Sequence, residues 1–345
     1  MPPARRLAQQ SVNGSICVVP YDHPIDCQWD AEALSFGGNV FHSRAWGDVC
    51  TTLDGEVLYL RLFHEGGLLG VAVASARRTR WRPLGRLRDV LTLNTPPALA
   101  PGVPRRDSLL AIEHFARSRG FGLLRIGSYA DPRPWDEGLP SPSRTRIYPR
   151  LEFRVPLGPD FPSTLARMHA KHRHSIRKAS DIGFEFTENT SLAGALTLHS
   201  LQEETFHRRR SLGNENAVAW ALESYRRTME AYLRSGLIRF FFASGRGAIL
   251  SGMGILEFGD SAYHLVGGTN GDGYKCGAAF ALFGYTINRL IAGGFSELNL
   301  GGVQPEAKNE QHIDHGLYRF KARLGATELT CRDIETRLTQ WFIHR

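Results

Sequence analysis

A glycine pair and a lysine near the C-terminal end of the chain carry its most specific chemical signal. Gly301 and Gly302 follow a predicted strand at 297–300, and glycines at a strand end let the backbone approach a ligand closely. Further along, residues 316–325 read GLYRFKARLG and place Lys321 directly after Phe320. A lone lysine on a helix is usually solvated, but a cation beside an aromatic residue and near a glycine pair favours a functional role.

Basic residues gather in a second segment, residues 171–178, which reads KHRHSIRK. On a helix, Lys171, His174 and Lys178 share one face, because positions i, i+3 and i+7 lie above one another. The core-facing positions are Leu165, Met168, Ile176 and Ala179. Such a basic face is either an ordinary solvated surface or a surface that follows a phosphate backbone, since Lys and Arg displace counterions from a polyanion. The sequence leaves both interpretations open.

A third segment runs from a predicted strand through a glycine-rich turn into a predicted helix, over residues 263–279. The free N–H groups at a helix start suit a phosphate or an oxyanion. Coenzyme A acetyltransferases usually place a basic residue or Gln, two spacers, Gly, a spacer, and Gly or Ala here. Residues 275–279, KCGAA, fit that pattern only in part. A tight turn that needs glycine explains the segment equally well.

Hydrophobic periodicity predicts the elements that position these motifs. The first half is expected to contain strands and helices at 16–20, 41–50 (with Ser43 as N-cap), 57–63, 68–76, 108–119 and 123–127. A proline-rich connection is expected at 131–149. In the second half we expect strands at 151–155, 184–187, 238–243, 249–258, 262–267, 297–300 and 327–330. Its helices are expected at 163–182, 192–210, 217–234, 277–292 and 316–324.

The element order of the second half is that of an N-acetyltransferase domain: helices, a three-stranded meander, a helix entered from a glycine-containing turn, and a strand. The first half repeats a shorter version of this order. The sequence therefore predicts an α/β (α+β) protein with two tandem GNAT-like (N-acyltransferase) domains, residues 1–150 and 151–345.

Composition restricts the class of protein further. Hydrophobic residues make up 42% and charged residues 22% of the 345 residues, which is ordinary for a globular protein. We find no apolar run of the ~20 residues that a membrane span needs. The five cysteines are scattered, which favours reduced thiols in a cytoplasm. We expect no metal, because no cluster shows zinc-site spacing, and no other cofactor. The net charge of +8 permits an RNA partner without requiring one.

The combination of motifs resembles the Fem family, the tRNA-dependent aminoacyltransferases that build peptidoglycan cross-bridges, and its relatives in antibiotic biosynthesis. The segments that carry the resemblance are 41–46 (FHSRAW), 172–183, 201–208 (LQEETFHR), 264–270 with Tyr274, 301–303 and 316–321. They span nearly the whole chain.

The resemblance implies twin acyltransferase-like domains and an aminoacyl group taken from tRNA rather than an acyl group taken from coenzyme A. Phe320 and Lys321 match the family's active-site pair, with Lys321 as the cation near the developing oxyanion or the leaving ribose oxygen. The expected substrate-binding residues are Tyr274, Arg208, Asn270 and Trp46. The residues expected to hold the tRNA acceptor stem are Lys171, Arg173, Arg177 and Lys178. The long helical arm of some members is absent, because no ~50-residue heptad block occurs.

The resemblance also bears on the acceptor, a small-molecule or peptide amine. Members that bind the nucleotide-linked cell-wall precursor carry a basic residue soon after the Trp motif, whereas residues 47–50 here read GDVC. Because of this departure, the expected acceptor can be an amine on a soluble metabolite as well as an amine on a peptide or a cell-wall precursor. Two alternatives stay open: an acyl-coenzyme A N-acyltransferase with the same fold, and a non-catalytic RNA-binding protein.

Overall fold

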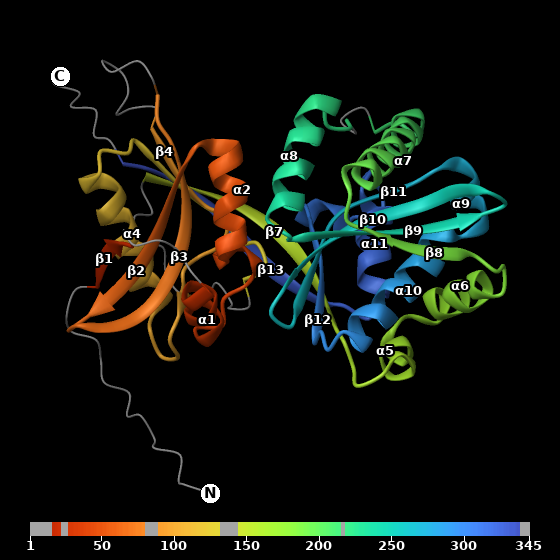
Figure 1. Cartoon of the computed structure of the whole chain (residues 1–345), viewed down its shortest axis with the longest axis horizontal. Helices are drawn as coiled ribbons and strands as arrows, with labels where there is room; N and C mark the ends of the chain where they lie inside the picture. The colour runs from red at the N-terminus through yellow and green to blue at the C-terminus, as the bar shows by residue number, and fades with distance from the viewer. Residues whose placement is uncertain (1–15, 22–26, 80–88, 132–143, 215–217, 339–345) are drawn as a thin grey trace, which may run out of the picture.

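The computed structural model describes residues 16–21, 27–79, 89–131, 144–214 and 218–338. Within these ranges, thirteen strands form one continuous sheet, with helices on both of its faces (Figure 1). The strand order is β1-β2-β3-β4-β6-β13-β7-β12-β11-β10-β9-β8, and β5 pairs with β3 outside this path.

The first half contributes one end of the sheet. Its strands are β1 (Cys17–Pro20), β2 (Glu56–His64), β3 (Gly67–Arg77), β4 (Val90–Leu93), β5 (Ala98–Leu99) and β6 (Leu123–Ile126). Strands β2 and β3 form the predicted hairpin, and β4 and β6 run parallel. Its helices are α1 (Cys27–Ser35), η1 (Val40–His42), α2 (Arg44–Asp54) and α4 (Arg105–Ser118). Ser43 caps α2 as expected, because its side chain accepts a hydrogen bond from the Trp46 N–H.

The second half contributes the other end. Its strands are β7 (Thr145–Pro156), β8 (Glu185–Asn189), β9 (Ile238–Gly245), β10 (Ala248–Phe258), β11 (Ser261–Thr269), β12 (Glu297–Val303) and β13 (Thr327–Arg337). Its helices are α5 (Phe161–Arg167), α6 (Ala170–Ser180), α7 (Leu192–Ser211), α8 (Leu222–Arg234), α9 (Gly271–Cys276), α10 (Ala278–Ala292), η4 (Pro305–Lys308) and α11 (His315–Arg323). Strands β9, β10 and β11 form the predicted meander.

The parallel pair β11 and β12 separates soon after it begins. Pairing covers only Ser261 to Tyr263 of β11 against Glu297 to Asn299 of β12. On its other side β12 pairs with β7 from Glu297 to Val303, so this pairing continues beyond the end of the pairing with β11. The two strands therefore diverge where β12 reaches Gly301 and Gly302.

The described residues form three apolar cores on the faces of the sheet. One is shared by the two halves, because residues of α1 and α2 such as Trp29 and Trp46 cluster with residues of α7 and α8 such as Leu198 and Tyr232. A second core lies on the opposite face of the second half and includes Ile176 of α6 and Leu282 of α10. A third lies beneath α4. The shared core packs the two halves against each other.

Strands β7 and β13 cross between the halves, as Figure 1 shows. Strand β13 pairs with β7 along Thr327 to Thr336 and with β6 at Ile334 to Arg337. The expected boundary between residues 150 and 151 falls inside β7, and the division into 1–150 and 151–345 stays a prediction.

The structure corrects several expected elements. The helix predicted at 163–182 is two helices, α5 and α6, because Met168 is extended and the His169 N–H donates to the carbonyl of Arg323. The connection predicted at 131–149 contains the first residues of β7, and residues 132–143 lie outside the described part of the chain. Helix α8 begins at Leu222 rather than at 217. Helix α1 and strand β4 were not predicted.

Trp46 gives a test of the shared core. Its side chain is 7% exposed and packs edge-on against Phe41, with ring centroids 5.0 Å apart. We expect Trp46→Ala to lower the free energy of unfolding by about 3–5 kcal/mol, because it leaves a large cavity. Trp220→Ala is the control, since that side chain is 50% exposed and should cost about 1 kcal/mol or less. Equal losses for the two variants in urea denaturation would contradict this account of the core.

Candidate active site at the β12 bulge

A β-bulge explains the glycine pair. Asn299 lies opposite Arg154, and Gly302 lies opposite Glu152, so β12 holds one residue more than β7 between these two pairs. The Asn299 side chain accepts a hydrogen bond from the Gly301 N–H at 2.7 Å and holds the bulge. Gly301 has φ +69°, and a side chain on Gly302 would start 2.6 Å from the Arg150 guanidinium. The strand was expected to end at this pair; it continues through the bulge to Val303.

Lys321 reaches this bulge from α11. Its ammonium donates a hydrogen bond to the Gly302 carbonyl at 3.0 Å, and the residue is only 9% exposed. Burial lowers the pKa of Lys321 from 10.5 to about 8, although the nearby Glu152 carboxylate opposes this shift. The interpretation of Lys321 as an ordinary solvated lysine is therefore wrong.

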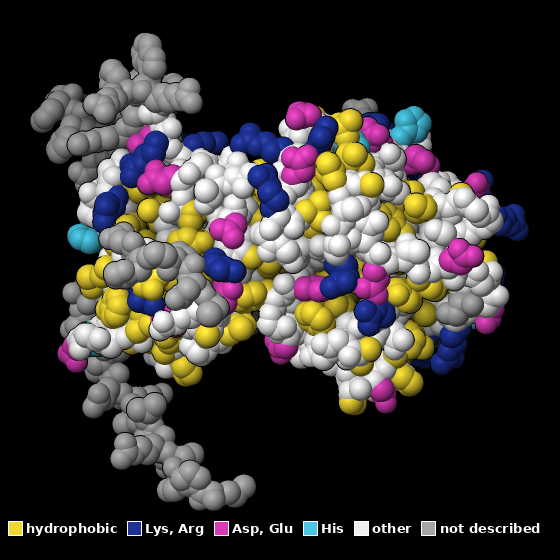
Figure 2. Space-filling view, viewed as in Figure 1, with side chains coloured by type: hydrophobic (Ala, Val, Ile, Leu, Met, Phe, Trp, Pro, Cys, Tyr) yellow, Lys and Arg dark blue, Asp and Glu magenta, His cyan; other side chains and the backbone are white. Residues whose placement is uncertain are grey.

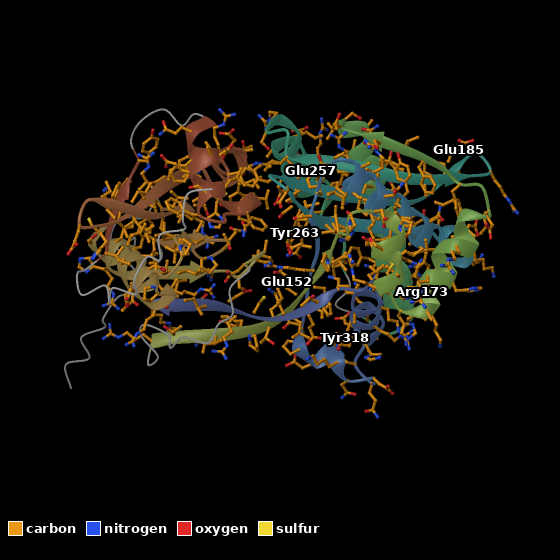
Figure 3. All side chains as sticks on the ribbon, turned by 90° about the horizontal axis from the view of Figure 1, so that it is seen from below. Glu152, Arg173, Glu185, Glu257, Tyr263 and Tyr318 are labelled. Carbon is orange, nitrogen blue, oxygen red and sulfur yellow. The ribbon has the colours of Figure 1, made fainter. Side chains whose placement is uncertain are left out.

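A buried carboxylate and guanidinium lie beside the bulge on β7. Glu152 is fully buried and accepts hydrogen bonds from the Ala130 N–H at 3.1 and 3.2 Å and from Arg150 at 3.3 Å. Arg150 also lies 4.2 Å over the ring of Tyr129 and 3.7 Å from Asp333. Ala130 and Tyr129 come from the first half, so residues of both halves build this polar cluster. Glu152 and Tyr263 are labelled at the middle of the molecule in Figure 3.

The aromatic partner of the lysine anchors α11. The half-buried ring of Phe320 packs against Phe280, Phe283 and His172, with centroids 5.6, 5.2 and 5.2 Å away. The His172 ring nitrogen Nε2 lies 3.1 Å from the Phe320 carbonyl, and burial lowers the pKa of His172 to about 4. A neutral His172 from the basic segment thus fixes the helix that carries Lys321.

A second neutral imidazole lies on β11. The pKa of His264 falls to about 3, first because its ring is enclosed and second because of the positive charge of Lys321. This ring lies 5.5 Å from that of Phe283. The Lys321 ammonium and the His264 carbonyl both lie within 3.8 Å of the point where a Cβ on Gly301 would start, so the lysine reaches the place where β11 and β12 separate.

The other expected substrate-binding residues lie apart from Lys321. Arg208 stacks on Tyr274 at 4.4 Å and donates to the Thr269 carbonyl at 3.2 Å. Thr269 is five residues beyond His264, about 17 Å along an extended strand. Tyr274 is 68% exposed, and Arg208 borders a surface hollow of about 560 Å³ between the end of α7 and Gly271. Tyr274 and Arg208 can therefore bind a substrate that reacts at Lys321 only if that substrate is long enough to reach both sites.

Asn270 and Trp46 have evident structural partners. The Asn270 side chain caps α9 by accepting from the Gly273 N–H at 2.8 Å, and it donates to the Ile249 carbonyl at 3.0 Å. Trp46 lies in the shared core. That Asn270 or Trp46 contacts a substrate stays a prediction, and the positions of the two side chains do not favour it.

The basic segment divides into two groups. Lys171, Arg177 and Lys178 are exposed on α6, and Figure 2 shows basic side chains at the lower right, where Figure 1 places this helix. Arg173 is half-buried and turns back to donate to the carbonyl oxygens of Ala166 and Met168. Arg173 therefore stabilises the junction of α5 and α6, whereas the other three cations face solvent.

Sequence reasoning missed Glu152 and Arg150 of the polar cluster beside the lysine, and it gave no individual role to Tyr263 and His264, which lie in the predicted segment 263–279. A signal was present in β7, where Arg150, Glu152 and Arg154 alternate with apolar residues that face the second core. Alternation places the three charged side chains on one face of the strand. Charged residues on the inner face of a central strand are costly to bury and point to a functional face.

Among the described residues, no group of three or more His, Cys, Asp or Glu side chains is arranged to hold a metal ion. None of their helices is long and apolar enough to cross a membrane.

The buried ammonium predicts a pH effect on stability. The unfolded chain, with a lysine pKa near 10.5, binds the proton more tightly than the folded chain, with a pKa of about 8. The free-energy penalty of burying the charged ammonium is complete below pH 8 and disappears as the pH rises to 10.5. The free energy of unfolding of the wild type minus that of Lys321→Met should therefore rise by up to about 3 kcal/mol over this range.

Lys308→Met is the matched control in that experiment. A hydrogen bond with Glu328 raises the pKa of Lys308, so the corresponding difference for this variant should not rise over the same pH range. A flat difference for Lys321→Met, measured by denaturant titration at several pH values, would contradict the burial of its ammonium.

Comparison with known proteins establishes the fold. Residues 166–321 match the family model described as an acetyltransferase (GNAT) domain. The crystal structure of FemX superimposes with a TM-score of 0.71 at 13% identity, covering 90% of this chain and 96% of FemX. L-PGS from Bacillus licheniformis matches with a TM-score of 0.53 at 15% identity, covering 91% of this chain and 92% of L-PGS. No protein of curated function matches this sequence. The predicted arrangement of two tandem GNAT-like domains is confirmed.

Proposed function

We propose that this chain, which contains a GNAT acyltransferase domain and has the fold of FemX, moves an aminoacyl group from a charged tRNA to an amine. The product is an amide, and the acceptor is the amine of a peptide, a cell-wall precursor or an antibiotic-type metabolite. The observation that carries the proposal is the buried Lys321 ammonium at the glycine bulge, where the two halves meet.

The chemistry needs little more than positioning and charge stabilisation. The ester of an aminoacyl-tRNA is already activated, and orientation of the reactants can supply roughly 7–11 kcal/mol in ideal cases. The amine nitrogen attacks the ester carbon, and the bond from that carbon to the ribose oxygen breaks. The net proton transfer is from the amine to the ribose oxygen. An ammonium with a pKa of about 8 suits donation to this oxygen near neutral pH.

The support for an RNA donor comes from two features. Three exposed cations lie on α6, the helix whose His172 contacts the Phe320 carbonyl next to Lys321. The turn that would hold the coenzyme A pyrophosphate carries only part of the usual pattern, and the short helix α9 fills part of it. We favour a soluble metabolite as the acceptor, because residues 47–50 lack the basic residue expected in a protein that binds a nucleotide-linked precursor.

The proposal predicts tRNA-dependent turnover. Purified protein, charged tRNA and a panel of amines should give an amide product that ribonuclease treatment abolishes. Lys321→Ala should cut the rate at least about tenfold, because it removes a charge that stabilises the transition state. Lys308→Ala removes an exposed lysine that pairs with Glu328, and it should leave the rate unchanged. An unchanged rate after ribonuclease or in Lys321→Ala would refute the mechanism.

The basic face of α6 predicts a salt effect. Replacing Lys171, Arg177 and Lys178 together by Ala should weaken tRNA binding, and the slope of log K against log salt should become shallower by about 2. The matched control replaces the three exposed arginines in and after α4, namely Arg106, Arg117 and Arg119. Filter binding at several salt concentrations would measure both slopes. Equal changes in the two triple variants would count against a specific role for α6.

One feature of α10 favours the alternative donor, acyl-coenzyme A. Helix α10 starts after Gly277 without a side-chain cap, which leaves its first N–H groups open to an anion. Saturable thermal stabilisation by acyl-coenzyme A, with none by tRNA, would favour that donor. Tight, salt-dependent RNA binding without turnover with any donor would instead favour a non-catalytic RNA-binding protein.

A further inference from the structure

The absence of a side chain at Gly301 leaves one spot lined by two hydrogen-bond donors. An atom placed where a Cβ would start lies 3.4 Å from the Tyr263 hydroxyl and 3.8 Å from the Lys321 ammonium. The backbone carbonyl of His264 lies 3.7 Å from the same point. The phenol from β11 and the ammonium from α11 therefore face the same side of Gly301, and a small group in contact with this side has both donors beside it.

The phenol ring is held rigidly in place. Tyr263 is 7% exposed, belongs to the shared core, and packs edge-on against Phe41 with centroids 5.5 Å apart. Burial, with a smaller effect of the Glu152 carboxylate, raises the pKa of Tyr263, so the phenol is neutral and can donate its proton. A rigid ring places its hydroxyl with little loss of conformational entropy when a ligand binds.

The hydroxyl of Tyr263 has no hydrogen-bond partner among the described residues, whereas buried phenols usually find one. The neighbouring ammonium uses one of its three N–H donors on the Gly302 carbonyl. Both groups therefore keep donors for one further acceptor.

We propose that Tyr263 is a catalytic residue of the reaction proposed above and forms, with Lys321, the oxyanion hole. When the amine attacks, the C–N bond forms and the carbonyl π electrons move to the oxygen, which becomes an oxyanion in contact with the side of Gly301 that faces the two donors. The Tyr263 hydroxyl and the Lys321 ammonium donate to this oxyanion. The C=O bond then re-forms, the ribose oxygen leaves with the electron pair of the ester bond, and the proton lost by the amine ends on that oxygen.

Position 301 then needs glycine for more than its backbone angle. A methyl group there would lie 3.4 Å from the Tyr263 hydroxyl and 3.8 Å from the Lys321 ammonium, and it would keep an oxygen from approaching both donors. Preorganised donors act strongly in a site from which water is excluded, because they need no reorganisation when the charge develops. The buried surroundings of both donors satisfy this condition.

The test is Tyr263→Phe, which keeps the ring in the core and removes only the hydroxyl. This variant should lose about 10²–10³-fold in kcat with KM unchanged, as for other lost oxyanion donors. Tyr225→Phe is the matched control, because Tyr225 lies in the same core, is 1% exposed, and has a buried hydroxyl without a partner. The control should keep wild-type kcat, and both variants should keep the wild-type melting temperature.

A double-mutant cycle separates catalysis from packing. If both donors bind one oxygen, the loss in Tyr263→Phe/Lys321→Ala is smaller than the product of the two single losses, because the sites are coupled. Multiplicative losses, an unchanged kcat in Tyr263→Phe, or a kcat loss that follows a fall in melting temperature would each overturn the inference. These outcomes leave the proposed function intact, since the wild type would still turn over charged tRNA. A wild type without tRNA-dependent turnover is the distinct result that removes the proposed function and this inference with it.

Discussion

The burial of one ammonium group at a bulge between diverging strands is the constraint on which the rest of the site depends. Removing a charge from water is expensive unless hydrogen bonds and opposite charges compensate for it. Here the Gly302 carbonyl accepts from Lys321, and the negative charge of Glu152 acts on it. The compensation is incomplete, because the pKa of Lys321 still falls to about 8. The protein thus keeps a cation that readily gives up its proton in a partly desolvated place.

Both halves of the chain are needed to hold this arrangement. Glu152 is fixed by Arg150 from its own strand and by the Ala130 N–H from the first half, and Arg150 lies against Tyr129. The shared core packs α2 against α8, and β13 pairs with strands of both halves. The first half therefore supports a site whose lysine comes from the second half. This mutual dependence gives a physical reason for two GNAT-like units to stay joined in one sheet.

The sequence was sufficient for most of the element order and for the lysine and glycine pair of the site, but not for α1, β4 or the polar cluster on β7. Lys321 stands out because the chain has few lysines, and Gly301 and Gly302 stand out as a pair. The bulge could not be predicted, because it depends on the register between β12 and a strand about 150 residues earlier. The break between α5 and α6 also lacks a local signal, since no Gly or Pro lies at Met168 and His169, and a hydrogen bond to Arg323 fixes it. Trp46 was misleading, because a tryptophan on a helix reads equally well as a binding residue and as a core residue.

The most direct test of the central claim is a titration of the Lys321 side chain by NMR in the full-length protein labelled at lysine. The chain has only five lysines, at 171, 178, 275, 308 and 321, so a Lys321→Arg sample identifies its resonance. The structure predicts a pKa of about 8 for this group. A pKa near 10.5, the usual value for a lysine in water, would contradict the burial of the ammonium and with it the proposed role of Lys321.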